Sequence, residues 1–478
     1  MNYRMIRHVL GLILLFLAAL MLLPVAAGLY YGENVLNFII TIAVTAALGF
    51  LLSRSKPRTT ALFARDGYVI VGLGWILLSL LGALPFVLSG SIPNYIDAVF
   101  ETVSGFTTTG ATILDDIEGL PRGESFWRMF THWIGGMGVL VFIMAIMPMS
   151  GEHSMHIMRA EVPGPTVGKL VPRTKKTASI LYLIYVCMTA LETVLLMCGG
   201  MSFYDALLHS FATAGTGGFS TRAASIAAFD SVYIEMVIAT FMLLFGVNFN
   251  LYFLLLIGRV KDFFKSEELH WFLAIIAAAV LAIAIGIEKM YGGFAVALRH
   301  AYFNVTSIIS TTGFGTVDFE QWPEYCKWIL VLLMFSGACA GSTGGGLKIS
   351  RIMVLAKAAV AEVKQMVRPR SISRVQLEGK RVDASAVKAI SIFFALYIFL
   401  LLLCTLLISF DGNDLVTNFT ASLSCLSNIG PGLSKVGPTG NFNVFSYPSK
   451  IILSFTMLLG RLEIYPVLVL FSRHTWKK

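Results

Sequence analysis

The stretch Thr107-Thr108-Thr109-Gly110-Ala111-Thr112 is the first of four polar, glycine-centred stretches in this 478-residue chain. The other three are Gly215-Thr216-Gly217-Gly218-Phe219-Ser220, Thr311-Thr312-Gly313-Phe314-Gly315-Thr316 and Asn428-Ile429-Gly430-Pro431-Gly432. Alignment on Gly110, Gly217, Gly313 and Gly430 puts the copies 107, 96 and 117 residues apart, and each follows a half-length apolar segment. One copy alone would be an ordinary loop with a helix-stopping glycine. Four copies at so long a period predict a duplicated structural unit.

The composition is that of a membrane protein. Hydrophobic residues make up 56% of the chain and charged residues only 13%, against roughly 25% charged in soluble domains. This excludes a soluble enzyme, a disordered chain and a nucleic-acid binder. A signal peptide is the alternative for the first apolar run, but that run is too long and a second follows at once. Runs long enough to suggest ten membrane spans cover residues 9–31, 37–52, 68–88, 126–149, 178–198, 232–257, 271–287, 328–340, 386–410 and 451–471.

The charge distribution predicts the orientation of these spans. The net charge is +9. If the N-terminus is cytoplasmic and the spans alternate, 27 of the 36 basic residues fall on the inner side, as the positive-inside rule requires. Acidic residues such as Asp115, Glu320 and Asp414 gather on the outer side, which disfavours an anionic substrate. We therefore expect a multi-pass protein of the cytoplasmic (inner) membrane with both termini in the cytoplasm.

The four glycine-centred stretches favour a cation pathway. Irregular backbone cannot face lipid, because its unpaired polar groups would be costly there, but it can line a water-filled path. Four such stretches around one axis would place backbone carbonyls in a ring that replaces the water shell of a cation. Glycine permits the required backbone dihedrals and a close approach to the ion. The half-length helices would point their carbonyl ends toward that ion.

These stretches resemble the filter segments of the Trk/Ktr/HKT superfamily of cation transporters, and most closely the TrkH/TrkG type of membrane subunit in bacterial Trk potassium uptake. The resemblance implies an all-α polytopic fold, with an N-terminal hairpin (1–60) and four helix–pore helix–filter–helix repeats (61–150, 151–260, 261–375 and 376–478) around one pseudo-fourfold pore. Glycine at all four filter positions goes with potassium in that family. The implied potassium-binding residues are Thr108, Thr109, Gly110, Thr216, Gly217, Thr311, Thr312, Gly313, Asn428, Ile429 and Gly430. The fourth copy departs most from the family pattern, because Asn428-Ile429 stands where threonines are expected.

Two further features interrupt apolar spans. Gly337 to Lys348 carries Gly341, Gly344, Gly345 and Gly346. A phosphate-binding loop is disfavoured, because the lysine comes late and lacks an adjacent Ser or Thr, whereas close helix packing remains an alternative. Arg461 lies in the last span, where a central arginine costs about 2.5–3.5 kcal/mol or more. The resemblance implies that the glycine-rich loop and Arg461 gate the pore beneath the filter; a pair with Glu463 or a position near the inner end is the alternative for Arg461.

The sequence therefore predicts a gated potassium pore and no enzyme, since its intramembrane ionisable residues form no catalytic set. A sodium- or proton-coupled symporter, with Glu192 as candidate carrier, and a poorly selective K⁺/Na⁺ pore remain alternatives. The resemblance implies a homodimer and a cytoplasmic ring of nucleotide-binding TrkA-type subunits. Membrane lipid is the other expected partner, and we expect neither nucleic acid nor a cofactor besides the transported K⁺.

Overall fold

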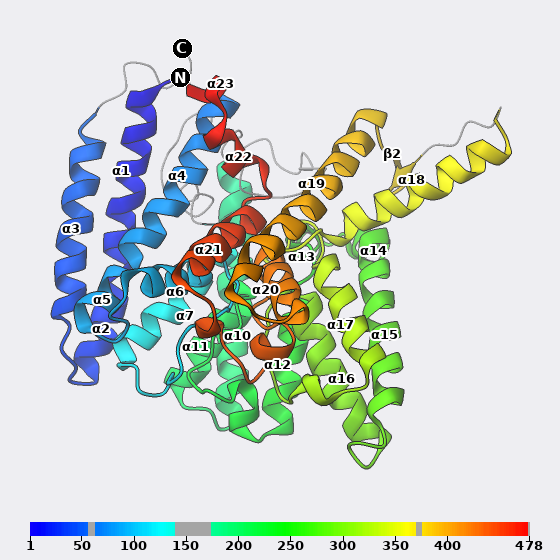
Figure 1. Ribbon diagram of the computed structural model, residues 1–478, viewed down its shortest axis with the longest axis horizontal. Coiled ribbons are helices and arrows are strands. Elements are labelled where there is room, and N and C mark those ends of the chain that lie inside the picture. Colours follow the sequence, from blue (N-terminus) through cyan, green and yellow to red (C-terminus); the bar gives the residue numbers. More distant parts are fainter. Residues whose placement is uncertain (56–62, 139–173, 370–374, 477–478) are drawn as a thin grey trace.

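The chain is built almost entirely from helices. The structure, a computed structural model, describes residues 1–55, 63–138, 174–369 and 375–476. Both termini lie at the same end of the molecule (Figure 1). In the described part, strands occur only in one small antiparallel hairpin, β1 (Gln376–Leu377) with β2 (Lys380–Arg381).

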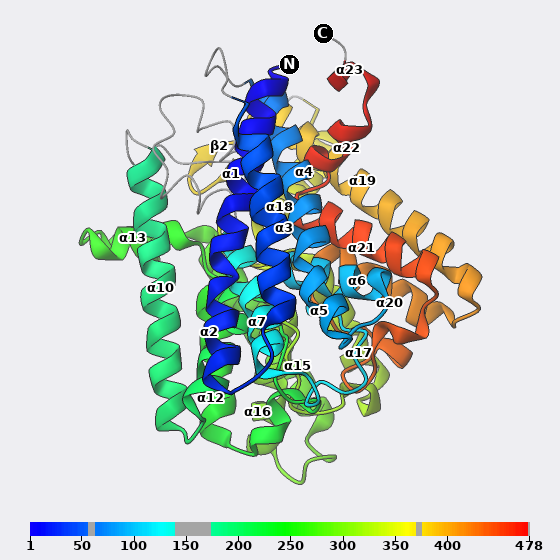
Figure 2. The ribbon, with the colours of Figure 1, turned by 90° about the vertical axis from the view of Figure 1, so that its left-hand side faces the viewer.

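The N-terminal segment forms the predicted helical hairpin. Helix α1 (Tyr3–Leu20) continues into α2 (Leu22–Tyr30), and α3 (Leu36–Ser53) returns beside them (Figure 2). The two arms touch at Gly11 and Gly49, where a Cβ on Gly11 would lie 2.6 Å from the Gly49 carbonyl oxygen. Small residues at such a crossing allow two helix backbones to approach closely, which is how helices associate in lipid.

After the hairpin, one order of elements occurs four times: a long helix, a short helix, a glycine-centred stretch and a closing helix of 13 to 15 residues. The first long helices are α4 (Ala64–Gly82), α10 (Thr174–Cys198), α15 (Glu267–Ile287) and α19 (Ala384–Ile408). The short helices are α6 (Tyr95–Phe106), α11 (Phe203–Gly215), α16 (Phe294–Ile309) and α20 (Leu415–Ser427). The closing helices are α7 (Arg122–Gly136), α12 (Val232–Phe245), α17 (Glu324–Ser336) and α21 (Tyr447–Arg461). The remaining α-helices of the described residues are α5 (Leu84–Ser89), α13 (Phe249–Leu256), α14 (Val260–Phe264), α18 (Ile349–Val367), α22 (Tyr465–Phe471) and α23 (Arg473–Trp476).

Three of the four short helices begin at a side-chain N-cap. Asn94, Ser202 and Asp414 each accept a hydrogen bond from a backbone N–H in the first turn of α6, α11 and α20, as favoured N-cap residues do. The hydroxyl and amide of Thr417 bond the Asp414 carboxylate and hold its pKa below the usual range. The C-terminal turns of these helices are buried, so the negative ends of their dipoles lie inside the protein.

Three of the closing helices, α12, α17 and α21, end at a break in the backbone. Helices α12 and α13 meet at a bend of 90° across Gly246 to Asn248. Helix α17 ends at Ser336, and α21 ends at Arg461 before a turn in which Glu463 and Ile464 have positive φ. The segments predicted as spans over 232–257 and 451–471 are therefore not continuous helices, because the backbone leaves the helix midway.

The number of spans stays a prediction. Six described helical segments are long and apolar enough to cross a membrane, or seven if the bent pair of α12 and α13 counts as one span. The predicted span over 126–149 coincides with α7 as far as Gly136, and its residues from 139 onward lie outside the described part.

Candidate functional site

The four glycine-centred stretches meet in a closed ring. A Cβ added at Gly110 would overlap the carbonyl oxygen of Gly217 in the second copy. In the same way Gly218 faces Thr312 O, Gly313 faces Ile429 O and Gly430 faces Thr109 O. Each copy thus packs its backbone against that of the next, and the fourth packs against the first. A side chain at any of these glycines would collide with the neighbouring copy.

The backbone corrects the alignment of the second copy. Gly110, Gly313 and Gly430 have φ of 81°, 84° and 102°, and the matching residue is Gly218, with φ of 75°. Gly217 was predicted as the equivalent glycine, but it lies one position earlier and matches Thr109. The two consecutive glycines of this copy make the sequence alignment ambiguous, and the backbone geometry resolves it.

Hydrogen bonds independently support this register. Thr109, Gly217, Thr312 and Ile429 each donate their backbone N–H to the carbonyl five residues earlier, at 2.8 to 3.0 Å. The residues before them, Thr108, Thr216, Thr311 and Asn428, all have left-handed backbone with φ between 55° and 62°. Asn428 adopts the conformation of the threonines that it replaces, since asparagine tolerates this region. The departure of the fourth copy in sequence therefore leaves the backbone geometry unchanged.

The side chains of the ring are fully buried and bonded within the protein. The Thr109 hydroxyl lies 2.8 Å from that of Thr107, and the Thr312 hydroxyl lies 2.7 Å from that of Ser310. Asn428 closes the ring, because its Nδ2 donates to Thr109 Oγ1 at 3.0 Å and to the Met457 carbonyl at 2.9 Å. These side-chain groups therefore find their partners within the protein.

A cavity of about 160 Å³ opens against the ring. Gly110, Gly218, Gly313 and Gly430 all line it. The structure thus brings the four equivalent glycines to one chamber, with Gly218 in the place predicted for Gly217.

The glycine-rich segment, which we call the loop (residues 337–348), packs against the other side of the ring. A Cβ on Gly344 would lie 2.8 Å from the Ser310 carbonyl oxygen, and one on Gly345 would overlap the Ser427 carbonyl oxygen. The Gly345 amide donates to Thr311 Oγ1 at 2.8 Å. The loop therefore contacts the ends of α16 and α20 directly, and glycine is required where it does so.

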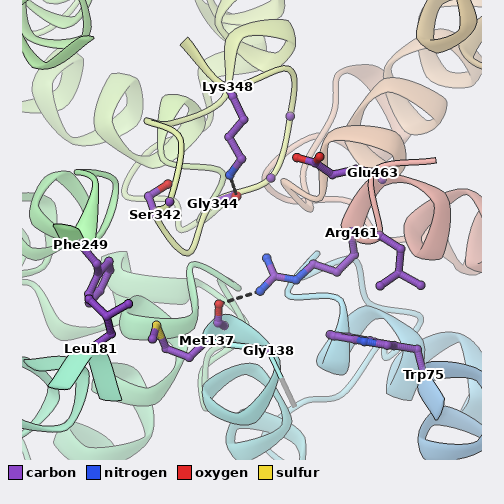
Figure 3. A pocket seen from close by; sticks show the side chains of 16 residues that line it. Trp75, Met137, Gly138, Leu181, Phe249, Ser342, Gly344, Lys348, Arg461 and Glu463 are labelled. Atoms are coloured by element: carbon purple, nitrogen blue, oxygen red, sulfur yellow. Dashed lines mark hydrogen bonds between the residues drawn. The ribbon is translucent and has the colours of Figure 1, made fainter. Parts of the chain in front are cut away.

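A single carboxylate holds the loop and the start of α18, which follows it. Glu268 Oε1 accepts the backbone N–H of Ala340 at 2.7 Å and that of Ser350 at 3.1 Å. Glu268 belongs to the first turn of α15, and the Glu378 carboxylate caps that turn by accepting the Glu268 amide at 3.1 Å. The Lys348 ammonium turns back to the Gly344 carbonyl (Figure 3).

Arg461 joins the loop to the end of α7. Its Nη1 donates to the Thr343 carbonyl at 2.8 Å, and its Nη2 donates to the carbonyls of Gly136, at 2.7 Å, and Gly135. Figure 3 shows the guanidinium extending from the break after α21 into the space beneath the loop. Glu463, the partner considered from the sequence, instead binds Arg351 through a 2.5 Å ion pair.

The loop and Arg461 line a second, smaller cavity of about 70 Å³. Gly341, Gly344, Gly345 and Gly346 face it together with Arg461. The structure therefore brings all five predicted gating residues to one place, on the side of the ring opposite the chamber of the four glycines.

Comparison with known proteins identifies the family. The family model TrkH, described as cation transport protein, matches residues 32–478. The chain belongs to the TrkH family of cation transport proteins. It is thus a multi-pass membrane transporter and not an enzyme.

Relatives of this TrkH-family chain match it over its whole length. It is 37% identical over 486 residues to the Trk system potassium uptake protein TrkH of Escherichia coli K12, covering 100% of both chains. It is 33% identical to TrkG of the same organism, covering 100% of this chain and 99% of that one. The crystal structure of the potassium transporter TrkH from Vibrio parahaemolyticus superposes with a TM-score of 0.90 at 33% identity, covering 100% of both chains. The all-α fold predicted from the sequence is thereby confirmed.

Sequence reasoning missed several residues that hold the TrkH-family ring in place. His132 of α7 connects two copies, because its Nε2 accepts the Phe219 amide at 3.3 Å and its Nδ1 donates to the Gly105 carbonyl at 2.7 Å. Glu101 and Arg128 form a buried ion pair beside the same stretches. The available signal was the presence of a charged or ionisable side chain inside an apolar segment.

Glu192, the predicted candidate carrier, is fully buried on α10. Neither of its carboxylate oxygens has a hydrogen-bond partner among the described residues.

Proposed function

We propose that this chain forms a gated, channel-like pore for potassium uptake. The observation that carries the proposal is the closed ring, with a glycine from each of the four copies facing one chamber. Carbonyls in such a ring can replace the water shell of K⁺. The ligands would come from Thr108, Thr109, Gly110, Thr216, Gly217, Gly218, Thr311, Thr312, Gly313, Asn428, Ile429 and Gly430. The full-length relatives named as potassium uptake proteins support the same ion.

The loop and Arg461 act as the gate in this proposal. Both lie directly beneath the ring, and Arg461 ties the loop to α7 through three carbonyls. Its positive charge would also oppose a cation on the axis. Opening then requires the release of the bonds to Gly135, Gly136 and Thr343.

The distribution of basic residues and the names of the relatives support a cellular location and a partner. We place the chain in the bacterial inner membrane, with both termini in the cytoplasm, as the positive-inside distribution favours. The relatives are named as parts of a Trk system, which supports a cytoplasmic nucleotide-binding partner of the TrkA type. A homodimer is proposed from the family resemblance.

Ion flux into liposomes tests the function. We expect the purified chain to pass K⁺ in preference to Na⁺, and Gly313→Ser to lower that preference, because a side chain there collides with the fourth copy. Gly412→Ser is the matched control, since Gly412 has the same left-handed backbone, φ 74°, in open space. Equal permeation of both ions by the wild type would overturn the potassium assignment.

The same assay separates a pore from a symporter. We expect K⁺ flux to persist when neither a proton nor a sodium gradient is present, and Glu192→Gln to leave it unchanged. Flux that requires either gradient would favour the symporter instead.

A further inference from the structure

One ion pair beside the ring is almost completely removed from water. The side chains of Glu101, on α6, and Arg128, on α7, are 0% and 1% exposed, and the Arg128 Nε lies 2.6 Å from Glu101 Oε1. Burial of two charges is costly even when they pair. A pair in this position therefore calls for an explanation beyond fold stability.

The pair holds the outer ends of two neighbouring ring stretches. The Glu101 carboxylate accepts the Thr112 hydroxyl at 2.9 Å and the Ile113 amide at 3.0 Å. The Arg128 Nη1 donates to the Ser220 carbonyl at 3.2 Å, and its guanidinium carbon lies 3.5 Å from the centre of the Phe219 ring. The first copy is thereby connected to the second immediately after Gly110 and Gly218.

In the other copies, neutral side chains make bonds at or next to the corresponding position. His209 Nε2 lies 2.9 Å from Ser220 Oγ, Asn304 Nδ2 donates to Thr316 Oγ1 at 3.5 Å, and Thr420 Oγ1 accepts the Leu433 amide at 2.9 Å. Each bond connects the short helix of one copy to a residue two or three positions after the ring glycine of the same copy. In the second copy the Asp205 carboxylate, 16% exposed, also accepts the Thr221 hydroxyl at 2.8 Å. Among these described contacts, the first copy alone makes the connection through an ion pair whose two side chains are both almost fully buried, and bonds to charged groups are the stronger ones.

We infer that the Glu101–Arg128 pair is a positioning element that sets the spacing of the ring between the first and second copies and thereby contributes to ion selectivity. This rests on the function proposed above. Neither side chain belongs to the ring itself, so both act through Thr112, Ile113 and Ser220. Because the pair is neutral as a whole, it fixes the backbone without adding net charge beside the cation path.

The test is the K⁺/Na⁺ flux ratio of the full-length protein in liposomes. The double variant Glu101→Gln/Arg128→Gln leaves no single buried charge, and we expect it to fold and to lose about tenfold in the ratio. The control is Lys327→Gln/Glu324→Gln, which removes a 2.6 Å ion pair with an exposed carboxylate, 81% accessible, and should keep the wild-type ratio. Arg128→Lys keeps both charges but cannot form the same forked bonds, so it should fold and show a smaller loss.

The possible outcomes separate the interpretations. A wild-type K⁺/Na⁺ flux ratio in both the double variant and Arg128→Lys would overturn the inference. This holds even if the variants express poorly, provided that the protein recovered has the wild-type ratio. If the two charges acted only through their electric field, Glu101→Gln and Arg128→Gln would change the flux in opposite directions and the double variant would behave like the wild type. That result would also overturn the inference. If the wild type itself fails to prefer K⁺, the proposed function fails first, and independently of the pair.

Discussion

The ring of glycine-centred stretches differs from the layer beneath it, made of the loop and Arg461, in how closely the four copies resemble one another. In the ring, four copies repeat the same backbone conformation and the same hydrogen bond to the residue five positions earlier. In the layer beneath, three copies whose residues are described there end their second helix differently: a 90° bend in one, an extended loop in another and a turn after Arg461 in a third. The copies therefore remain alike where they build the ring and have diverged beneath it.

This difference separates two properties of a pore. A ring of equivalent contacts from all copies suits selection, because every ligand must lie at the same distance from the axis. A barrier needs contacts that break together, and a single side chain such as Arg461 can supply them. We expect substitutions in the ring to block ion flux or to change which ion passes, and substitutions in the layer to raise the flux without changing which ion passes.

The largest effect is expected in the ring, from Gly218→Ala. The new Cβ would overlap the Thr312 carbonyl oxygen, on a backbone that disfavours any side chain. We expect K⁺ flux in liposomes to fall about 100-fold. The matched comparison is Gly217→Ala, because Gly217 lacks the positive φ of Gly218 and a Cβ there would meet the His132 side chain rather than a backbone carbonyl; it should retain more flux. Equal loss in both would contradict the corrected register.

An opposite and smaller effect is expected in the layer, from Arg461→Ala. The change removes the bonds to Thr343, Gly135 and Gly136 together with a positive charge. We expect K⁺ flux to rise about tenfold with no change in the K⁺/Na⁺ ratio. Flux at or below the wild-type level, at normal expression, would count against a gate at this position. A fall in the K⁺/Na⁺ ratio would contradict the expectation that the layer affects flux and the ring affects selectivity.

The smallest effect is expected from Glu268→Gln, which weakens the support of the loop without touching the ring. An amide oxygen can still accept the Ala340 and Ser350 amides, but a neutral acceptor binds them less strongly than a carboxylate. We expect K⁺ flux to rise about three- to fivefold. Glu267→Gln is the control, because that neighbouring side chain pairs with Lys357 instead. An increase of the same size in the control would assign the effect to surface charge.

The ring could be predicted from the sequence because its signal is local and repeated. Each copy carries its own apolar segment and glycine, so comparison within one chain reveals the unit. The error at Gly217 arose where two glycines stand together, since composition alone does not show which one has positive φ. Asn428 looked like an exception, and only the backbone shows that it keeps the threonine conformation.

The layer beneath could be predicted only in outline. Three consecutive glycines signal a broken helix, and an arginine in an apolar span signals a special environment. The partners of Arg461 lie 118, 325 and 326 residues away in the chain, where no periodic pattern connects them. The bend between α12 and α13 depends in part on a bond from the Phe249 amide to the Gly341 carbonyl. Such long-range contacts are set by packing and leave no local trace.

The bond from Asn428 to Thr109 has a consequence for biogenesis. It spans 319 residues and joins the last copy to the first, at the one junction of the ring that no chain segment connects directly. A nascent chain that has inserted only three copies into the membrane has an open ring, in which the Thr109 hydroxyl lacks its partner. Closure of the ring depends on the final quarter of the polypeptide, so a truncated product cannot complete it.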